Sequence, residues 1–370
     1  MQLAEEPTMR RISYLIVTIL VLPIYSGSLA QTAFTEQQLE DFIASEVAAT
    51  ANFNVERVGW NNFLHIPNVT QHEDKFVVRP NSDTLYSMNP FDVEDGYLVI
   101  ELPETNRYMS LMIYEIDHYL ANDGVIINET RPIVIVKKGN PEPDIENARV
   151  ITVQRNRGVL LVRTLLLGVE DLPNVRELQQ SMSATKVGTD YGKTPMVSPL
   201  SPEKLAEMRN FFRDRTGQVS WDEMYVTRSE PIETINRAQG VYEGGGALPA
   251  SEAKYVSIFT DTTGEKLSSE NQYAFTVSAD IPVRYFWSAT VYDDGGLLIP
   301  NEGRVYSANS EVRTTNEDGS TTVTFGKCTP EIANCIPTGD GDWNMTWRYY
   351  GPEGAIADNT WEHIKPAIVK

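Results

Sequence analysis

Ionisable side chains with the chemistry of acid–base catalysis gather around a stretch interrupted by a proline, Phe76 to Ser87. The carboxylates of Asp83 and Asp117 can accept a proton or orient the imidazole of His65. An arginine beside them would hold an anionic or oxygen-rich group through two parallel hydrogen bonds. This pattern predicts a polar site whose catalytic candidates are His65, Asp83 and Asp117.

Other polar residues near this stretch are candidates for holding a ligand. They are Arg79, Asn81, Tyr86, Arg107 and Tyr108. A second interpretation stays open, in which Arg79 or Arg107 forms an internal ion pair with Asp83 or Asp117 and fixes a turn to a sheet. In that case the cluster stabilises the fold and performs no chemistry.

The last third of the chain contains a second set of aromatic and hydrogen-bonding residues. Its ligand-binding candidates are Trp287, Tyr292, Asn301, Arg304 and Arg348. Flat aromatic faces beside planar polar groups suit sugar rings, and a junction between domains is a frequent place for a ligand. The alternative is aromatic core packing, because Phe286 and Trp287 are adjacent and one of them must face inward.

The common catalytic signatures are absent from the sequence. It has no Gly-x-Ser-x-Gly elbow, no His-Glu-x-x-His motif, no dinucleotide fingerprint and no Cys-x-x-Cys pair. The sequence has 4 histidines, His65, His72, His118 and His363, so a three-histidine metal site would have to recruit nearly all of them. We therefore predict no metal site, and the sequence assigns no cofactor.

Short runs rich in Val, Ile, Leu and Tyr, divided by Gly, Pro, Asn and Asp, predict strands in two blocks. The first block comprises Gly96–Leu102, Tyr108–Ile116, Gly124–Ile127, Pro132–Lys137, Ala148–Val153 and Gly158–Leu167. The second comprises Tyr255–Thr260, Tyr273–Val277, Arg284–Tyr292, Thr321–Gly326 and Met345–Tyr350. Strands without long helices between them indicate antiparallel sheets. The predicted fold is mainly β with accessory helices, in two β-sandwich or jelly-roll-like domains.

Apolar residues at spacings of three and four predict the accessory helices. The expected helices are Thr35–Thr50, Asn54–Phe63, Leu172–Met182 and Ser201–Thr216, with a mixed, partly helical segment at Trp221–Ala238. The stretch Val187–Leu200 lacks a hydrophobic period and marks a boundary. The expected domains are therefore residues 31–186 and 251–370, joined by a linker and helical segment at 187–250.

The first 30 residues have the features of a signal peptide. Arg10 and Arg11 precede an apolar run from Ile12 to Tyr25, and Ser28-Leu29-Ala30 offers the small residues that a signal peptidase needs. The run is shorter than the roughly 20 residues that span a bilayer, which disfavours an uncleaved membrane anchor. We expect cleavage after Ala30, and a protein that is periplasmic or extracellular.

The net charge indicates which classes of molecule the protein is expected to bind, and the cysteine content predicts a disulfide. The formal net charge is −20, from 51 acidic and 31 basic residues, so binding to nucleic acid or to anionic lipid is not expected. In an exported protein the close pair Cys328 and Cys335 predicts a disulfide that closes a local loop. A small polar molecule is the expected partner, no stable membrane insertion is expected after signal cleavage, and the oligomeric state is left open, a homo-oligomer included.

Two motif sets resemble a known pair of domains. The string Arg79 to Ser87, preceded by Trp60 to His65 and followed by Arg107-Tyr108 and Asp117, resembles the family called domain of unknown function 1254. Its usual companion, domain of unknown function 1214, is resembled by Phe286 to Asp293, Asn301-Glu302, Arg304 to Tyr306, Asp318 to Ser320, Asn334 to Pro337 and Trp347 to Pro352. The resemblance assigns no activity.

Two functional hypotheses follow. The first is an enzyme, of hydrolase or lyase type, that acts on a small polar or carbohydrate-like ligand. The second is a ligand-binding or scaffold protein of the cell envelope that performs no catalysis. The enzyme requires His65 and a carboxylate to open on a shared cleft, whereas the scaffold buries the polar cluster against Arg79 and Arg107.

Overall fold

The structure is a computed structural model that describes residues 33–72, 78–225, 227–229 and 232–369. From Glu36 onward the chain forms one compact unit. The predicted signal peptide, residues 1–30, lies outside the described residues. In the part of the chain that is described, no helix combines the length and the apolar character needed to cross a bilayer.

A five-stranded sheet organises the first half of the chain. Its order is β1-β2-β8-β4-β5, and every neighbouring pair is antiparallel. Its strands are β1 (Leu64–Ile66), β2 (Thr84–Asp92), β4 (Met109–Glu115), β5 (Leu120–Ile127) and β8 (Arg157–Leu165). β8 is the central strand, so its register with β2 and β4 decides which side chains of the first domain lie near one another.

A four-stranded sheet packs on one face of this sheet. Its order is β7-β6-β3-β9, and the pair β6–β7 is parallel. Its strands are β3 (Tyr97–Glu101), β6 (Ile133–Lys137), β7 (Arg149–Val153) and β9 (Ser183–Val187). Alternate residues of both sheets, such as Leu111 and Val162 from one and Ile100 and Ile135 from the other, form one fully buried core. The first half is therefore a β-sandwich.

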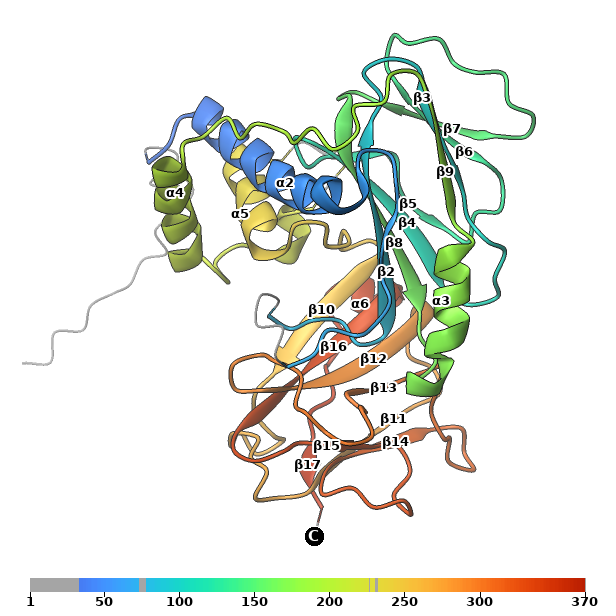
Figure 1. Ribbon diagram of the computed structural model, residues 1–370. Helices are drawn as coiled ribbons and strands as arrows, with labels where there is room; N and C mark the ends of the chain where they lie inside the picture. Colours follow the sequence, from blue (N-terminus) through green and yellow to red (C-terminus); the bar gives the residue numbers. More distant parts are fainter. Residues whose placement is uncertain (1–32, 73–77, 226, 230–231, 370) are drawn as a thin grey trace, which may run out of the picture. The chain divides into compact units, whose positions relative to one another are not determined.

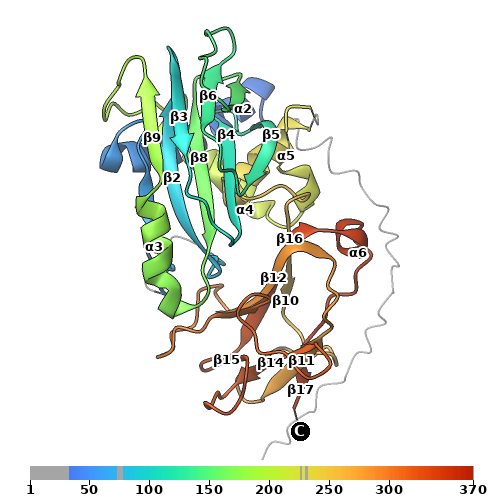
Figure 2. The ribbon, with the colours of Figure 1, turned by 90° about the vertical axis from the view of Figure 1, so that its right-hand side faces the viewer.

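The second half repeats this plan with two four-stranded sheets. One has the order β10-β16-β12-β13 and the other β15-β14-β11-β17, with β14–β15 parallel. The strands are β10 (Ala253–Ile258), β11 (Tyr273–Val277), β12 (Val283–Asp293), β13 (Ser307–Asn309), β14 (Thr321–Gly326), β15 (Cys335–Pro337), β16 (Trp343–Pro352) and β17 (Ala367–Ile368). Their inner faces share a core that includes Trp287, Trp347, Phe275 and Phe325. Figure 2 shows both sheets of this sandwich.

The helices lie outside the sandwich cores. They are α2 (Glu36–Val58), η1 (Val169–Asp171), α3 (Leu172–Gln180), α4 (Pro202–Asp214), η2 (Trp221–Glu223), α5 (Thr234–Gly244) and α6 (Gly354–Ala357). Figure 1 shows α2, α4 and α5 on one side of the five-stranded sheet and strands β3, β6, β7 and β9 on the other. The helices thus cover part of the face that the first sandwich does not bury.

The mainly β fold with antiparallel sheets and accessory helices is confirmed, and three local details differ from the expectation. The expected separate helix at Asn54–Phe63 is the last turns of α2, which ends at Val58 before Gly59 turns the chain with a positive φ of 81°. Strand β9 was missed because its side chains alternate weakly in burial. The pairs β6–β7 and β14–β15 are parallel, within sheets whose other neighbouring pairs are antiparallel.

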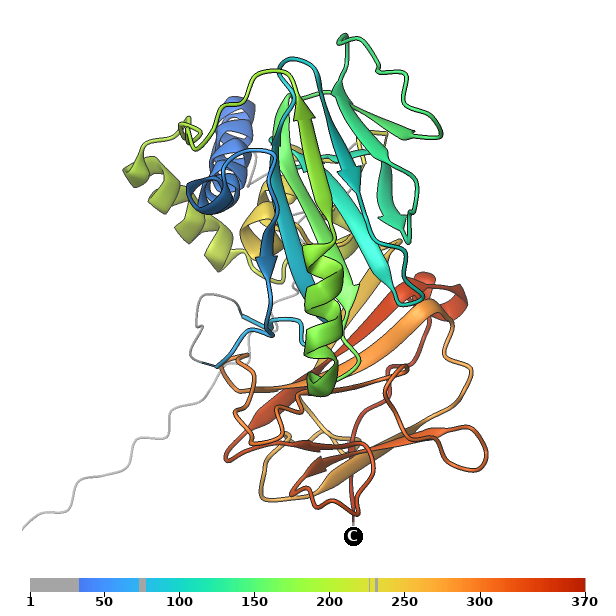
Figure 3. The same ribbon diagram turned by 45° about the vertical axis from the view of Figure 1, so that its right-hand side comes forward.

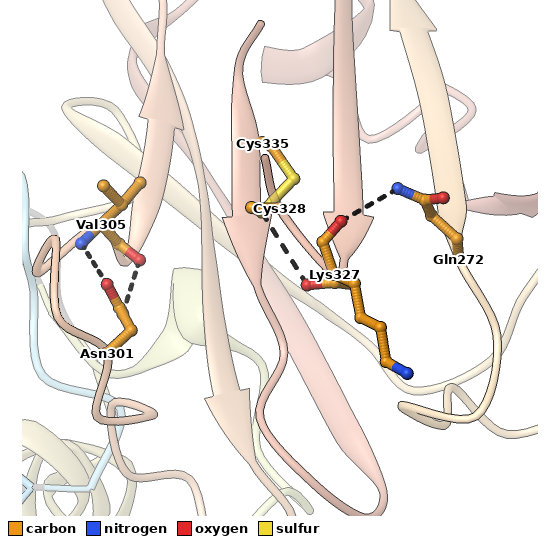
Figure 4. Close-up of a disulfide and its surroundings, with 7 residues drawn as sticks. Gln272, Asn301, Val305, Lys327, Cys328 and Cys335 are labelled. Carbon is orange, nitrogen blue, oxygen red and sulfur yellow. Dashed lines mark hydrogen bonds between the residues drawn. A yellow bond between two sulfur atoms is a disulfide. The ribbon is translucent and has the colours of Figure 1, made fainter. Parts of the chain in front are cut away.

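The predicted disulfide between Cys328 and Cys335 is present. It joins the end of β14 to the start of β15, and Figure 4 shows it beside Lys327, whose carbonyl accepts a hydrogen bond from Gln272. The bond closes a loop with a sequence separation of 7. It therefore holds the parallel pair β14–β15 at the edge of its sheet.

Replacing both cysteines by serine is expected to lower the free energy of unfolding by about 2–3 kcal/mol, because the unfolded chain gains the entropy of an open loop. Urea denaturation under non-reducing conditions measures this loss. A thiol reductant should destabilise the wild-type protein by a similar amount and leave the Cys328→Ser/Cys335→Ser variant unchanged. Equal midpoints for the reduced and oxidised wild-type protein would contradict the prediction.

Candidate functional site

Residues 79–83, which we call the clamp segment, lie on the outer face of the sheet that contains β12 and β16. The backbone N–H of Arg79 donates to the carbonyl of Gly296 at 2.8 Å, and its guanidinium donates to Asn344 and Thr346. Arg79 has a positive φ of 53° and precedes Pro80, a combination that costs free energy in an L-residue. These contacts with the second sandwich hold the strained bend in place.

The rest of the clamp segment also bonds to the second sandwich. The Asn81 amide donates to the Tyr350 hydroxyl at 2.7 Å. The carboxylate of Asp83 accepts hydrogen bonds from Ser288 at 2.6 Å, Ser307 at 2.8 Å and Asn309 at 3.2 Å. Asp83 is 1% exposed, so its charge is satisfied by buried hydroxyl and amide donors.

Arg348 in β16 supplies the positive charge of this interface. Its guanidinium donates to Thr290 at 2.8 Å, to the Tyr292 hydroxyl at 2.6 Å and to the Arg79 carbonyl at 3.0 Å. Burial alone would lower the pKa of Arg348, but Tyr292, Tyr350 and the charge of Asp83 more than offset this and raise it. The side chain stays charged, and Asp83 is the carboxylate that compensates it.

The structure does not bring the three catalytic candidates together. Asp83 accepts a backbone hydrogen bond from Leu166, whereas Ile116, next to Asp117, donates to Arg157. Leu166 and Arg157 are nine positions apart along an extended strand, which corresponds to roughly 30 Å. The expected convergence of Asp83 and Asp117 at one site is therefore wrong.

Asp117 is held by arginines on the far side of the first sandwich. Its carboxylate accepts hydrogen bonds from Arg155 at 2.8 Å and Arg228 at 2.7 Å. Burial would raise the pKa of Asp117, but the bonds from Arg228 and Arg155 outweigh it and lower the pKa. Asp117 therefore forms an internal ion pair, as the second interpretation of the sequence expected, but its partners are Arg155 and Arg228 and not Arg79 or Arg107.

His65 lies in β1, between the other two candidates. Its Nδ1 is 2.8 Å from the hydroxyl of Ser87, and burial lowers its pKa. A serine beside a histidine is the arrangement of an activated nucleophile. However, Ser87 is only 1% exposed, and no carboxylate among the described residues bonds to the His65 ring. A substrate has no access to this hydroxyl.

The ligand-binding candidates divide into two groups. Those that meet at the interface between the sandwiches are Arg79, Asn81, Tyr86, Tyr108, Tyr292 and Arg348. The others lie elsewhere. Arg107 forms an ion pair with Asp171 and fixes the start of α3, Trp287 is buried in the core of the second sandwich, and Asn301 bonds both backbone groups of Val305 (Figure 4).

A cavity of about 420 Å³ lies between the two sandwiches. Its walls come from residues 68–71 and the η1–α3 region on one side and from β13, β15 and their loops on the other. Figure 3 shows α3, in green, beside the strands of the second half. Val69 packs against apolar clusters of both sandwiches at this place. The volume lies within the range of small-molecule sites.

The chemistry of the cavity wall is mixed. Apolar side chains such as Leu172 and Ile336 share it with hydroxyls and amides, including Ser307 and Asn309, which also hold Asp83. Arg304 is the charged side chain among its described lining residues, and no described acidic residue lines it. Ser82 lines the cavity, and its hydroxyl is buried and has no hydrogen-bond partner among the described residues. The described wall therefore includes one cationic residue, Arg304, and no acidic residue.

Sequence reasoning identified Arg304 but missed the other polar groups of the cavity wall. Ser82, Ser307 and Asn309 are small polar residues next to motif positions, and no residue type or spacing marks them. Within the described residues, no group of three or more His, Cys, Asp or Glu side chains is placed to hold a metal ion.

Two family models match the chain. Residues 60–186 match the family described as protein of unknown function DUF1254, and residues 252–354 match protein of unknown function DUF1214. No curated protein matches the chain. Residues of both matched regions line the cavity.

Two solved structures are similar. The VPA0106 protein from Vibrio parahaemolyticus has 17% sequence identity and a TM-score of 0.69, with 90% of this chain and 99% of that chain covered. An uncharacterised protein from Burkholderia cenocepacia has 15% identity and a TM-score of 0.48, with 90% and 87% covered. The first similarity shows that the fold is shared over nearly the whole length of both chains.

Proposed function

We propose that this chain, whose residues 60–186 and 252–354 match the families DUF1254 and DUF1214, binds a small polar ligand between the two matched regions. The observation that carries this proposal is the cavity of about 420 Å³, which residues of both domains line and which has Arg304 in its wall. Binding without catalysis is favoured over the hydrolase or lyase hypothesis, because Asp83 and Asp117 are buried, fully bonded and far apart.

The wall composition defines the ligand class. Arg304 favours a carboxylate or another anionic group, and the absence of acidic side chains among the described lining residues removes repulsion. Apolar residues on the opposite wall favour an aliphatic or ring-shaped body. We expect a small carboxylate with an apolar or sugar-like body to fit better than its neutral analogue.

We also propose that the protein acts outside the cytoplasm. Disulfides persist in oxidising compartments, and the Cys328–Cys335 bond joins the signal-peptide pattern as support. Fractionation of cells that express the full chain tests this, and recovery of the protein with its cysteines reduced in the cytoplasm would refute it.

Isothermal titration with matched pairs, glucuronate against glucose and benzoate against benzyl alcohol, tests the ligand proposal. The acid of each pair is expected to bind more tightly. Arg304→Gln should weaken acid binding by about tenfold or more, because a charge-assisted hydrogen bond contributes roughly 1.5–3 kcal/mol. The matched control is Arg213→Gln, which changes an exposed arginine outside the cavity.

Ser82→Ala tests whether the buried hydroxyl beside the cavity contributes to stability. Since the Ser82 hydroxyl has no partner among the described residues, its removal should leave the melting temperature unchanged or slightly higher. If neither acid binds, or if Arg304→Gln and Arg213→Gln behave alike, the cavity does not have the proposed role.

A further inference from the structure

Aliphatic side chains form the accessible apolar part of the cavity wall. Those that line the cavity and keep part of their surface accessible come from both halves of the chain, and they are Val69, Val169, Leu172, Val305, Val312 and Ile332. Val169, Val305 and Val312 are 37%, 41% and 43% exposed, and we call these three valines the mouth of the cavity. Exposed apolar side chains that gather around one cavity are typical of a binding site. The wall therefore favours an occupant with an apolar part.

The same wall presents little aromatic surface. Aromatic rings, and sugar rings with an apolar face, bind best by stacking on an aromatic side chain. Tyr306 is the aromatic residue among the described lining residues, and it is 8% exposed and packs in a cluster with Tyr292 and Leu298. Little of its ring is accessible from the cavity. The accessible wall therefore suits an aliphatic chain better than a sugar or an aromatic ring.

A cationic residue adjoins this aliphatic wall. Arg304 precedes Val305 in the chain, is exposed and is the charged residue among the described lining residues. The Asn301 side chain closes the turn that carries both: its oxygen accepts a hydrogen bond from the Val305 N–H at 2.9 Å, and its Nδ2 donates to the Val305 carbonyl at 3.0 Å. The turn holds Arg304 at a positive φ of 51°. A fixed turn thus places a cationic and an apolar residue side by side at the cavity.

We propose that the ligand of this cavity is an aliphatic monocarboxylate, whose carboxylate binds Arg304 and whose chain is buried against the mouth valines and the other aliphatic residues of the wall. This inference rests on the proposed function and narrows its ligand class from an apolar or sugar-like body to an aliphatic chain. Burial of the chain supplies affinity because it removes apolar surface of both ligand and protein from water. Arg304 selects the acid over the corresponding alcohol.

Isothermal titration with sodium butanoate, hexanoate and octanoate tests the inference. Affinity should rise about two- to fourfold with each added CH₂ group, the ratio expected for its burial. Hexanoate and gluconate are a matched pair, because they have the same chain length and charge and differ in hydroxyl groups. Gluconate should bind about tenfold more weakly or less. If no carboxylate binds, the proposed function fails as well. If gluconate or benzoate binds more tightly than octanoate, the cavity keeps its proposed function and the aliphatic inference alone is overturned.

The matched variants are Val312→Ser and Val197→Ser. Both replace an exposed valine by serine, and Val197, which is 89% exposed, does not line the cavity. Val312→Ser should weaken octanoate binding about threefold and preserve the preference for hexanoate over hexanol, which depends on Arg304. Val197→Ser should change neither. Equal affinities for butanoate and octanoate, binding of many octanoate ions per chain, or identical behaviour of the two variants would overturn the inference.

Discussion

Asp83→Asn is expected to lower the free energy of unfolding by about 3–5 kcal/mol, the cost of leaving a buried charge without its partner. The charge of Asp83 acts on Arg348 and helps to raise its pKa, and both side chains are almost fully buried. The substituted amide would also place an N–H₂ group opposite the donors Ser288, Ser307 and Asn309. Loss of charge and loss of acceptors therefore act in the same direction.

Urea denaturation at neutral pH measures this change. The matched control is Asp214→Asn, because Asp214 forms its ion pair with Arg213 at the surface, where such pairs contribute about 0–1 kcal/mol. The cavity walls include Ser307 and Asn309, so Asp83→Asn should also weaken ligand binding. A variant as stable as wild type would show that Asp83 does not hold the two sandwiches together.

Acidification is expected to destabilise the protein through His118. Burial, assisted by the charge of Arg237 and opposed by Asp117, lowers the pKa of His118 to about 4. Its Nε2 accepts a hydrogen bond from the backbone N–H of Gly246 at 3.1 Å, and Tyr114 and Tyr225 pack on its ring. Protonation would destroy that acceptor and place a second cation near Arg237.

The direction of this pH effect follows from the difference in the His118 pKa between the folded and the unfolded chain. The unfolded chain binds a proton at His118 below about pH 6.5, and the folded chain binds it only near pH 4. The contribution of the neutral His118 ring to the free energy of unfolding is therefore fully present above pH 6.5 and is lost as the pH falls toward 4. It amounts to about 3 kcal/mol, since one pKa unit corresponds to about 1.4 kcal/mol.

The variant His118→Asn tests this contribution, because asparagine tolerates the positive φ of 60° at this position. Its stability should fall less than that of wild type between pH 7.5 and pH 4. Between pH 7.5 and 8.5 the difference between the two proteins should stay constant, which serves as the internal control. Parallel pH profiles over the whole range would refute the assignment to His118.

Local sequence chemistry predicted most of the strands and the disulfide, because alternation, turn residues and cysteine spacing are local properties. It could not predict which candidates meet. Asp83 and Asp117 belong to one motif set, but the β2–β8 and β4–β8 registers place them at opposite ends of β8. Strand register depends on side-chain packing across the sheet and is invisible in a single segment.

The same limit explains what sequence reasoning omitted. Arg163 interrupts an apolar run, Val159 to Leu167, and a lone cation in a buried strand is a recognisable signal. The surroundings of this cation depend on the second sandwich, since the rings of Tyr350 and Phe286 pack on Tyr108 beside it. In the same way, Asn81, Tyr292 and Arg348 were selected by type alone, and their meeting required the two halves to pack together.

Scanning calorimetry of the full chain tests the central claim most directly, which is that the clamp segment joins the two sandwiches into one cooperative unit. We predict a single transition for the wild-type protein, with equal calorimetric and van't Hoff enthalpies, that separates into two transitions in Asp83→Asn. Two independent transitions in the wild-type protein, unaffected in their spacing by Asp83→Asn, would contradict it.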